Sequence, residues 1–225
     1  GAQVAIKAEP ASAAHGCLER EVRAYRALSD SERVPRILWE GTCALGGRAM
    51  VTELLGPSLA DLLEFCGKRF SLKTTLMLMR QMIDCLEAVH SAGLVHRDLK
   101  PENFLIGLGA KASVVHIIDF GLSAAWIDRK TGLHVPYREN RGHVGTARYS
   151  SVGAHLGKQQ GRRDDLESLG YLMLYFLQGS LPWQHAQLFC RDDKERLREI
   201  QDRKAALSVD RLSRRHPPEI AMYLR

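Results

Sequence analysis

The sequence predicts an α+β fold in which a small N-terminal sheet precedes a larger helical region. Three short apolar runs are typical of strands: residues 4–7, 36–40 and 48–53. After residue 58, apolar side chains recur instead at helical spacing over longer stretches. We therefore expect a bilobal domain over residues 1–225, with a sheet lobe and connecting segment in 1–55 and a helical lobe in 56–225.

Apolar spacing and capping residues indicate where the first helices lie. A helix over 18–28 has one apolar side: Leu18, Val22, Tyr25 and Leu28. Ser58 and Ser71 are suitable N-caps for helices over 59–65 and 72–92, and Gly93 should end the second of these. In the 72–92 helix we expect these residues to face the core: Leu72, Leu76, Met79, Ile83, Leu86 and Val89 or His90.

The later helices differ in character. The helix that begins at Arg162 and ends at Gly179 is expected to be the buried centre of the larger lobe, with one side lined by Leu166, Leu169, Met173, Phe176 and Leu177. Residues 193–206 form a mixed-charge pattern that predicts a solvated helix. Two prolines, Pro217 and Pro218, precede the start of a last helix over 219–225.

The composition argues against several classes of protein. No stretch has the apolar length of a membrane span, and no aromatic–basic alternation suggests nucleic-acid binding. The five cysteines are odd in number and lack a C-x-x-C, which argues for a reducing compartment and against disulfides or zinc. A net charge of +6 suits acidic or phosphorylated partners. We expect a monomer of the cytoplasm and/or nucleus that binds neither membranes nor nucleic acid.

One polar stretch organises the rest of the chain: His96-Arg97-Asp98-Leu99-Lys100-Pro101-Glu102-Asn103. It matches the H-R-D-L-x-x-x-N signature of protein-kinase catalytic loops. Phosphoryl transfer needs a carboxylate that accepts the proton of the attacking hydroxyl, a cation near the transferring phosphate and an oxygen ligand for magnesium. Asp98, Lys100 and Asn103 suit these three roles. The alternative is an exposed polar loop with a routine Lys-Pro turn.

A second motif, Asp119-Phe120-Gly121, follows sixteen residues after Asn103 and ends an apolar run over 114–118. An Asp at the end of a buried strand can hold magnesium against ATP phosphates, and Gly121 permits a sharp turn there. The tripeptide alone is a weak signal. At this distance, the two segments can form a hairpin, which would present Asn103 and Asp119 at the same end of its two strands.

A third motif lies at the start of the chain. Val4-Ala5-Ile6-Lys7 equals the V-A-I-K element, whose Lys contacts the ATP phosphates and pairs with a helix Glu. Glu21 lies beside the apolar stripe of the first helix and is the expected partner of Lys7, with Glu19 as its rival. The alternative for Lys7 is an ordinary surface residue at a strand end.

In this order the motifs resemble the eukaryotic protein-kinase fold, and longer stretches resemble the casein kinase 1 family. These stretches are 53–59 (Glu-Leu-Leu-Gly-Pro-Ser-Leu), 134–140 (His-Val-Pro-Tyr-Arg-Glu-Asn), 145–149 (Gly-Thr-Ala-Arg-Tyr), 162–171 and 179–184. The resemblance covers essentially the whole chain. One corner departs from the family, because Ser151-Val152-Gly153 stands where its members carry Ser-Ile-Asn.

The resemblance implies a Ser/Thr kinase that uses ATP and Mg²⁺. Lys7 would bind the phosphates, Glu21 would hold Lys7, Asp98 would be the base, and Asn103 and Asp119 would bind metal. Four residues would surround the adenine: Thr52 at the back of its pocket, Leu55 at the hinge, and Leu105 and Ile118 against the ring.

Substrate preference is a further implication of the resemblance. Members of the family favour acidic or already phosphorylated protein substrates. Arg141, Arg148 and Arg196 fall where members of that family carry an anion-binding patch.

Two other functions remain open from the sequence. The chain starts at Lys7's strand, so the Gly-rich loop that should precede it is not included, and we expect a fragment. Its absence is compatible with an inactive, kinase-like scaffold or binding module, although Lys7, Asp98 and Asp119 are all retained. A kinase for small molecules is the other alternative, against which the long basic segment after Gly121 argues.

Overall fold

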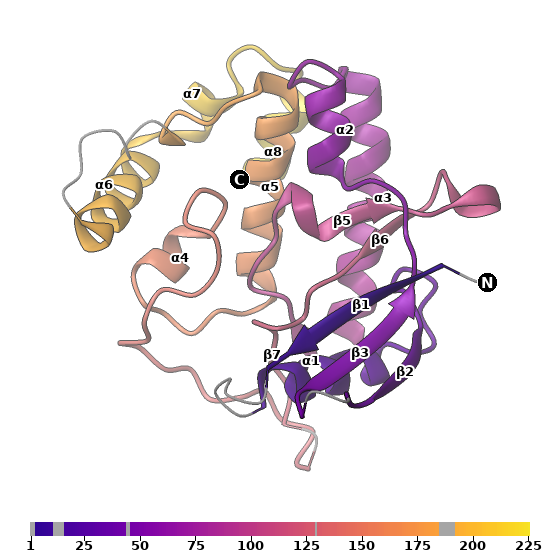
Figure 1. Cartoon of the computed structure of the whole chain (residues 1–225). Coiled ribbons are helices and arrows are strands. Elements are labelled where there is room, and N and C mark those ends of the chain that lie inside the picture. Colours follow the sequence, from indigo (N-terminus) through magenta and orange to yellow (C-terminus); the bar gives the residue numbers. More distant parts are fainter. Residues whose placement is uncertain (1–2, 11–15, 44–45, 129, 185–191) are drawn as a thin grey trace.

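The protein consists of a small antiparallel sheet on one side and a group of helices on the other, which confirms the predicted α+β fold (Figure 1). This computed structural model describes residues 3–10, 16–43, 46–128, 130–184 and 192–225. The sheet has the strand order β1-β3-β2, from β1 (Val4–Glu9), β2 (Ile37–Thr42) and β3 (Arg48–Glu53). Helix α1 (Cys17–Ala27) lies beside it and buries Leu18, Val22 and Tyr25, as the sequence predicted.

Residues 54–58 leave the sheet and lead into the helical part. Helix α2 (Leu59–Phe65) begins with a reciprocal cap, because Ser58 accepts from the Asp61 N–H while the Asp61 carboxylate accepts from the Ser58 N–H at 2.9 Å. Helix α3 (Leu72–Ser91) is capped by Ser71, whose side chain accepts from the Thr74 N–H. Gly93 follows the end of the helix with φ +80°. The predicted caps are therefore correct.

Helix α5 (Arg162–Gln178) runs through the centre of the helical part, beside α3 (Figure 1). Ten of its residues are buried, including Leu169, Leu172, Leu174 and Phe176. They surround the helix rather than form one stripe, as expected for an element covered on all sides. The prediction of a buried centre is confirmed, but Leu166 is exposed because it lies in the first turns, where less of the fold covers the helix.

The predicted inner face of α3 is partly wrong. Leu76 is 47% exposed, and Leu72 and Ile83 are exposed as well, whereas the core side is formed by Thr75, Met79, Met82, Cys85, Leu86 and Val89. The helix is rotated relative to the apolar stripe because α5 and β6 pack against the side that carries Met82 and Cys85. Polar Thr75 thus occupies a core position that the apolar spacing predicts for Leu76.

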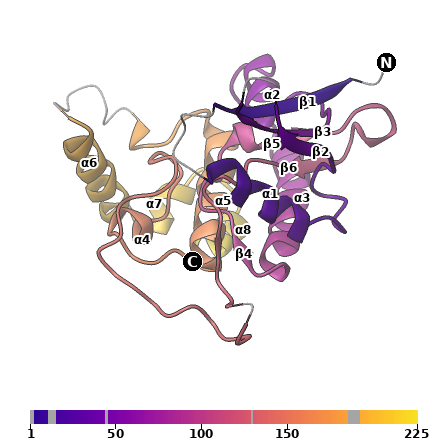
Figure 2. The same ribbon diagram turned by 60° about the horizontal axis from the view of Figure 1, so that its bottom comes forward.

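One small hairpin and one further strand pair lie between the helices and carry the motifs. Strands β5 (Phe104–Ile106) and β6 (Val115–Ile117) pair antiparallel, with Phe104 opposite Ile117. Strands β4 (Leu94–Val95) and β7 (Ala124–Ala125) form the second pair. After β7, residues 126–128 and 130–151 belong to a long loop on the outside of the molecule that reaches α4 (Val152–His155), as Figure 2 shows.

The remaining elements are short turns and C-terminal helices: η1 (Pro101–Asn103), η2 (Gly109–Lys111), α6 (Asp193–Ala206), α7 (Val209–Ser213) and α8 (Pro218–Leu224). Most of α6 is exposed, which agrees with the predicted solvated face, and its inner side buries Ile200 and Lys204. Among the helices that the structure describes, none has the length and apolar character needed to cross a membrane.

Candidate active site

The hairpin of β5 and β6 brings the predicted polar residues to one place. Asn103 directly precedes β5 and Asp119 follows β6, and because Phe104 pairs with Ile117 the two residues lie at the same end of the hairpin. The Ile118 N–H donates to the Asn103 carbonyl at 3.0 Å, which fixes the two chains side by side. Asp119 adopts φ +66°, a left-handed conformation that turns the chain sharply after the strand.

Lys7 connects the sheet to this hairpin. Its ammonium lies 2.7 Å from Glu21 Oε2 and 2.9 Å from Asp119 Oδ1, so residues from β1, α1 and the end of β6 meet at one cation. Glu21 is buried, whereas the rival Glu19 pairs with Arg23 and Arg48 on the exposed side of α1. The sequence left the choice open, and the structure brings Glu21 to Lys7.

The three charges affect one another's protonation. Burial alone would raise the pKa of the Asp119 carboxyl, but the hydrogen bond and charge of Lys7 outweigh it and hold that pKa below its ordinary value. Burial would lower the pKa of Lys7, and the two carboxylates reverse this, so its pKa is raised. Burial does raise the pKa of Glu21 despite Lys7. Asp119 therefore remains anionic and able to bind a cation.

Asp98 is a nearly buried carboxylate whose two oxygens are both engaged. Lys100 donates to Oδ2 at 2.8 Å, and the backbone N–H and hydroxyl of Thr146 donate to Oδ1 at 2.8 and 2.7 Å. The amide of Asn103 donates to the Asp98 carbonyl at 2.9 Å, and its amide oxygen accepts no hydrogen bond from another described residue. The carboxylate is thus fixed in orientation.

The backbone around Asp98 is held from below by Asp165 of α5. Its two carboxylate oxygens accept from the N–H groups of His96 and Arg97, at 2.8 and 2.9 Å, and the ring of His90 donates to the same carboxylate. Arg97 has φ +71°, so these hydrogen bonds stabilise a strained conformation. Asp165 thus supports the backbone of the Asp98 loop from α5.

The end of the long loop also packs against this backbone. Gly145 has φ +102°, and a Cβ there would lie 2.3 Å from the Arg97 carbonyl, so only glycine fits. This close approach places Thr146 on Asp98. No local sequence pattern predicts Thr146 as part of the site, because 48 residues separate it from Asp98.

A cavity of about 270 Å³ lies between the sheet and the hairpin. All eight residues predicted for the nucleotide and its metal line it: Lys7, Glu21, Thr52, Leu55, Asn103, Leu105, Ile118 and Asp119. The N–H and C=O of Leu55 make no hydrogen bond to another described residue, so this peptide can pair with a flat polar ring. Apolar walls with charged groups at one end suit a molecule that joins an aromatic ring to an anion.

The three predicted arginines lie in two neighbouring hollows rather than one patch. Arg148 and Arg196 line a hollow of about 450 Å³ together with Thr146. Arg141 instead lines a hollow of about 300 Å³ with Arg97 and Lys158, and His143 borders both. No sequence pattern predicts Lys158 at this site, because it comes near Arg141 through the hydrogen bond that the Arg141 N–H donates to the Gly157 carbonyl.

Among the described residues, Arg141 and Arg148 form no ion pair with the nearby carboxylates of Glu139 and Asp164. Glu139 instead accepts from Tyr137, and Asp164 accepts from Ser151. The Arg148 guanidinium lies 5.7 Å from the ring centre of Tyr149, and Arg196 lies 3.0 Å from Asp193. In the part of the chain that the structure describes, no three His, Cys, Asp or Glu side chains form a further metal-binding group.

Comparison with known families agrees with this geometry. The family model described as "Protein kinase domain" matches residues 2–220, nearly the whole chain. The match includes the Lys7–Glu21 pair, the Asp98 loop and Asp119, which the fold brings around one cavity. The chain therefore belongs to the protein kinase family.

Proposed function

We propose that this protein is a Ser/Thr protein kinase of the casein kinase 1 type, which transfers the γ-phosphate of ATP to acidic or already phosphorylated proteins. The observation that carries the substrate class is the pair of basic hollows next to Asp98. Thr146 lines one of them and donates to Asp98, so an anion bound there lies close to the base. Long stretches that resemble casein kinase 1 sequences support the subfamily.

The residues around the cavity suit ATP. The aromatic ring fits between Leu105 and Ile118 with the free Leu55 peptide at its edge, and Lys7 holds the phosphates at the charged end. Asp119, kept anionic by Lys7, and the amide oxygen of Asn103 form an oxygen donor set of the kind that Mg²⁺ prefers. When bound, the metal ion would neutralise charge on the phosphates.

Asp98 is the group that meets the substrate hydroxyl. Its carboxylate is fixed by Thr146 and Lys100, so it can orient the hydroxyl and accept its proton without losing rotational freedom at the moment of reaction. Lys100 has a raised pKa because Asp98 outweighs its partial burial, and therefore stays cationic beside the transferring phosphate.

The hollows suit a phosphate or carboxylate near the target residue. The guanidinium groups of Arg148 and Arg141 offer forked donors, and Arg97 and Lys158 add positive charge around Arg141. A substrate with an anionic residue a few positions before its Ser or Thr would place that residue there. Substrates without it would lose this binding energy.

The test compares primed and unprimed peptides. Arg141→Gln and Arg148→Gln should each raise KM for a peptide with a phosphorylated or acidic residue before the target by roughly tenfold, the effect of losing one charge-assisted contact. KM for a neutral peptide should stay unchanged. The preference should also weaken with salt, since these groups are partly solvated.

Arg138→Gln is the control, because Arg138 is exposed in the same loop and lines neither hollow. An unchanged ratio of kcat/KM for primed and unprimed peptides in both variants would contradict the substrate class. If no protein or peptide accepts phosphate while ATP still binds, the non-catalytic scaffold is the better description.

A further inference from the structure

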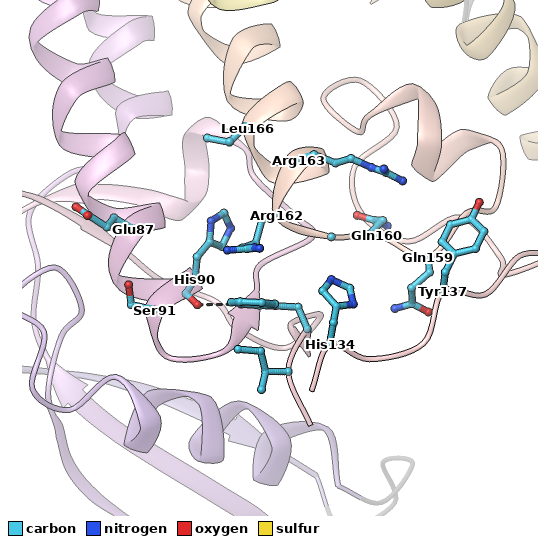
Figure 3. Close-up of a pocket in the computed structure, with 13 residues that line it drawn as sticks. Glu87, His90, Ser91, His134, Tyr137, Gln159, Gln160, Arg162, Arg163 and Leu166 are labelled. Carbon is cyan, nitrogen blue, oxygen red and sulfur yellow. Dashed lines mark hydrogen bonds between the residues drawn. The ribbon is translucent and has the colours of Figure 1, made fainter. Parts of the chain in front are cut away.

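A larger hollow, of about 1040 Å³, opens away from the nucleotide cavity. Figure 3 shows its walls, which come from the end of α3, the long loop and the start of α5. It shares no lining residue with the nucleotide cavity. We call it the α3–α5 groove, and none of the roles described above uses it.

The floor of the groove is a stack of rings and a cation. The Arg162 guanidinium lies 3.7 Å from the ring centre of Trp126, and the ring of His134 lies 5.7 Å from the same indole. The Trp126 Nε1–H donates to the His90 carbonyl at 2.8 Å, drawn as the dashed line in Figure 3, so the indole is fixed to the end of α3. A guanidinium stacked by one face keeps its N–H edges free for an anion.

The groove is positively charged. Arg162 has no carboxylate partner among the described residues, and Arg163 lies 3.8 Å from Asp164, whose carboxylate already accepts from Ser151 and Gly161. Arg162 and Arg163 point in different directions in Figure 3 and so reach different parts of the hollow. Glu87 is the one acidic residue of the lining. An anionic ligand would therefore gain two guanidinium groups.

The groove continues into the hollows that border Asp98. Gln159 and Gln160 line both the α3–α5 groove and the hollow of Arg97 and Arg141. That hollow in turn shares His143 with the one that contains Thr146. An extended polypeptide whose target hydroxyl reaches Asp98 can thus run past Arg141 and into the groove without leaving a hollowed, basic surface.

We propose that the α3–α5 groove is a docking site for an acidic segment of the protein substrate, remote from the phosphorylated residue. Carboxylates of the segment bind the edges of Arg162 and Arg163, and an apolar or aromatic side chain packs against Trp126. The identification of the occupant as substrate rests on the proposed function. The groove would add affinity for long substrates and leave the chemistry at Asp98 unchanged.

A binding measurement tests the groove without turnover. The probe is a fluorescein-labelled peptide rich in Glu and Asp, with one Phe and no Ser, Thr or Tyr, titrated with the full chain by fluorescence anisotropy. Arg162→Glu should weaken binding by roughly tenfold or more, since it replaces attraction by repulsion. Trp126→Ala should weaken it as well, because the stacked guanidinium loses its support.

Control measurements distinguish a loss of binding from a loss of folding in these variants. A Glu at the first residue of α5 is favourable with respect to the helix dipole, so Arg162→Glu should keep its circular dichroism spectrum, and Arg162→Gln provides a milder second variant. Arg80→Glu, on the exposed side of α3 and outside the groove, changes the net charge equally. Equal weakening by Arg80→Glu, or unchanged binding by Arg162→Glu and Arg162→Gln, would overturn the proposal.

Kinetics then separates the two proposals. A short primed peptide and the same peptide with an added acidic segment are compared as substrates of the wild type and Arg162→Glu. The variant should raise KM for the long peptide by roughly tenfold, with kcat and the short peptide unaffected. If neither peptide is phosphorylated by the wild type, the proposed function fails, while the anisotropy result still decides whether the groove binds acidic segments. An equal KM effect on both peptides would overturn the groove's role in docking.

Discussion

The Asp98 carboxylate is held at both oxygens, by Lys100 on Oδ2 and by Thr146 on Oδ1, so its orientation is set before a substrate binds. The spacing of His96 to Asn103 predicted Asp98, Lys100 and Asn103 as one group, and the structure brings them together through short side-chain hydrogen bonds. Local motifs are readable because neighbours in sequence remain neighbours in space. Thr146 and Lys158 were missed because they reach the site only through the close approach of Gly145 to Arg97 and of Arg141 to Gly157.

Replacement of Asp98 by Asn should lower kcat strongly and preserve nucleotide binding. Asn has the same shape but cannot accept a proton, so kcat should fall by about two to four decades, the usual contribution of a general base. The nucleotide cavity does not include Asp98, and the Kd for Mg-ATP should stay within about twofold. Single-turnover kinetics and a calorimetric titration measure the two quantities, and wild-type turnover in Asp98→Asn would remove the assignment of the base.

Among the elements, α3 shows how far apolar spacing can be trusted. Its ends were predicted within one residue because Ser71 and Gly93 mark them by capping chemistry. Its inner face was predicted less well, because apolar residues occupy both sides of the helix and spacing alone cannot decide which side α5 covers. The same reason applies to α5, where apolar residues occur all round.

Two substitutions in α3 test this assignment of its faces. Met82 is fully buried, so Met82→Ala should lower the free energy of unfolding by about 2–5 kcal/mol through lost burial and a cavity. Leu76→Ala, on the half-exposed side, should change it by less than about 1 kcal/mol. Urea denaturation of both variants measures the difference, and a larger effect of Leu76→Ala would show that the helix is rotated toward the face that its sequence pattern predicts.

At the scale of the whole molecule, buried Lys204 connects the C-terminal helices to the active-site loop. Its ammonium donates to the carbonyls of Ala147 and Ser150, at 3.0 Å for the first, and lies 4.8 and 5.0 Å from the ring centres of Tyr171 and Trp183. One cation thus holds α6, α5 and the residues after Thr146 together. The mixed-charge pattern of α6 does not indicate which of its charged residues is buried, so the sequence alone does not identify Lys204.

Burial of Lys204 should make the stability of the protein depend on pH. Burial lowers the pKa of Lys204 to about 7 in the folded state, from 10.5 in the unfolded chain, although Glu167 acts in the opposite direction. Between these two values the unfolded chain holds a proton that the folded protein does not. Unfolding then takes up a proton, so stability should rise with pH in this window, by at most about 1.4 kcal/mol per pH unit.

The difference between the wild type and Lys204→Met isolates this effect. Met keeps the apolar stem and removes the amine, so the lost hydrogen bonds change the free energy of unfolding by an amount that does not vary with pH. His155 contacts Lys204 and is also titratable. Burial and Lys204 lower the pKa of His155 to about 3, which is below the pH window of the experiment. Urea denaturation from pH 7 to 10 should show the wild type gaining stability relative to Lys204→Met. The matched Lys194→Met, at an exposed position of the same helix, should show no such trend. A pH-independent difference for Lys204→Met would mean that Lys204 stays charged in the folded protein, held by its two carbonyls and two rings strongly enough to offset its burial.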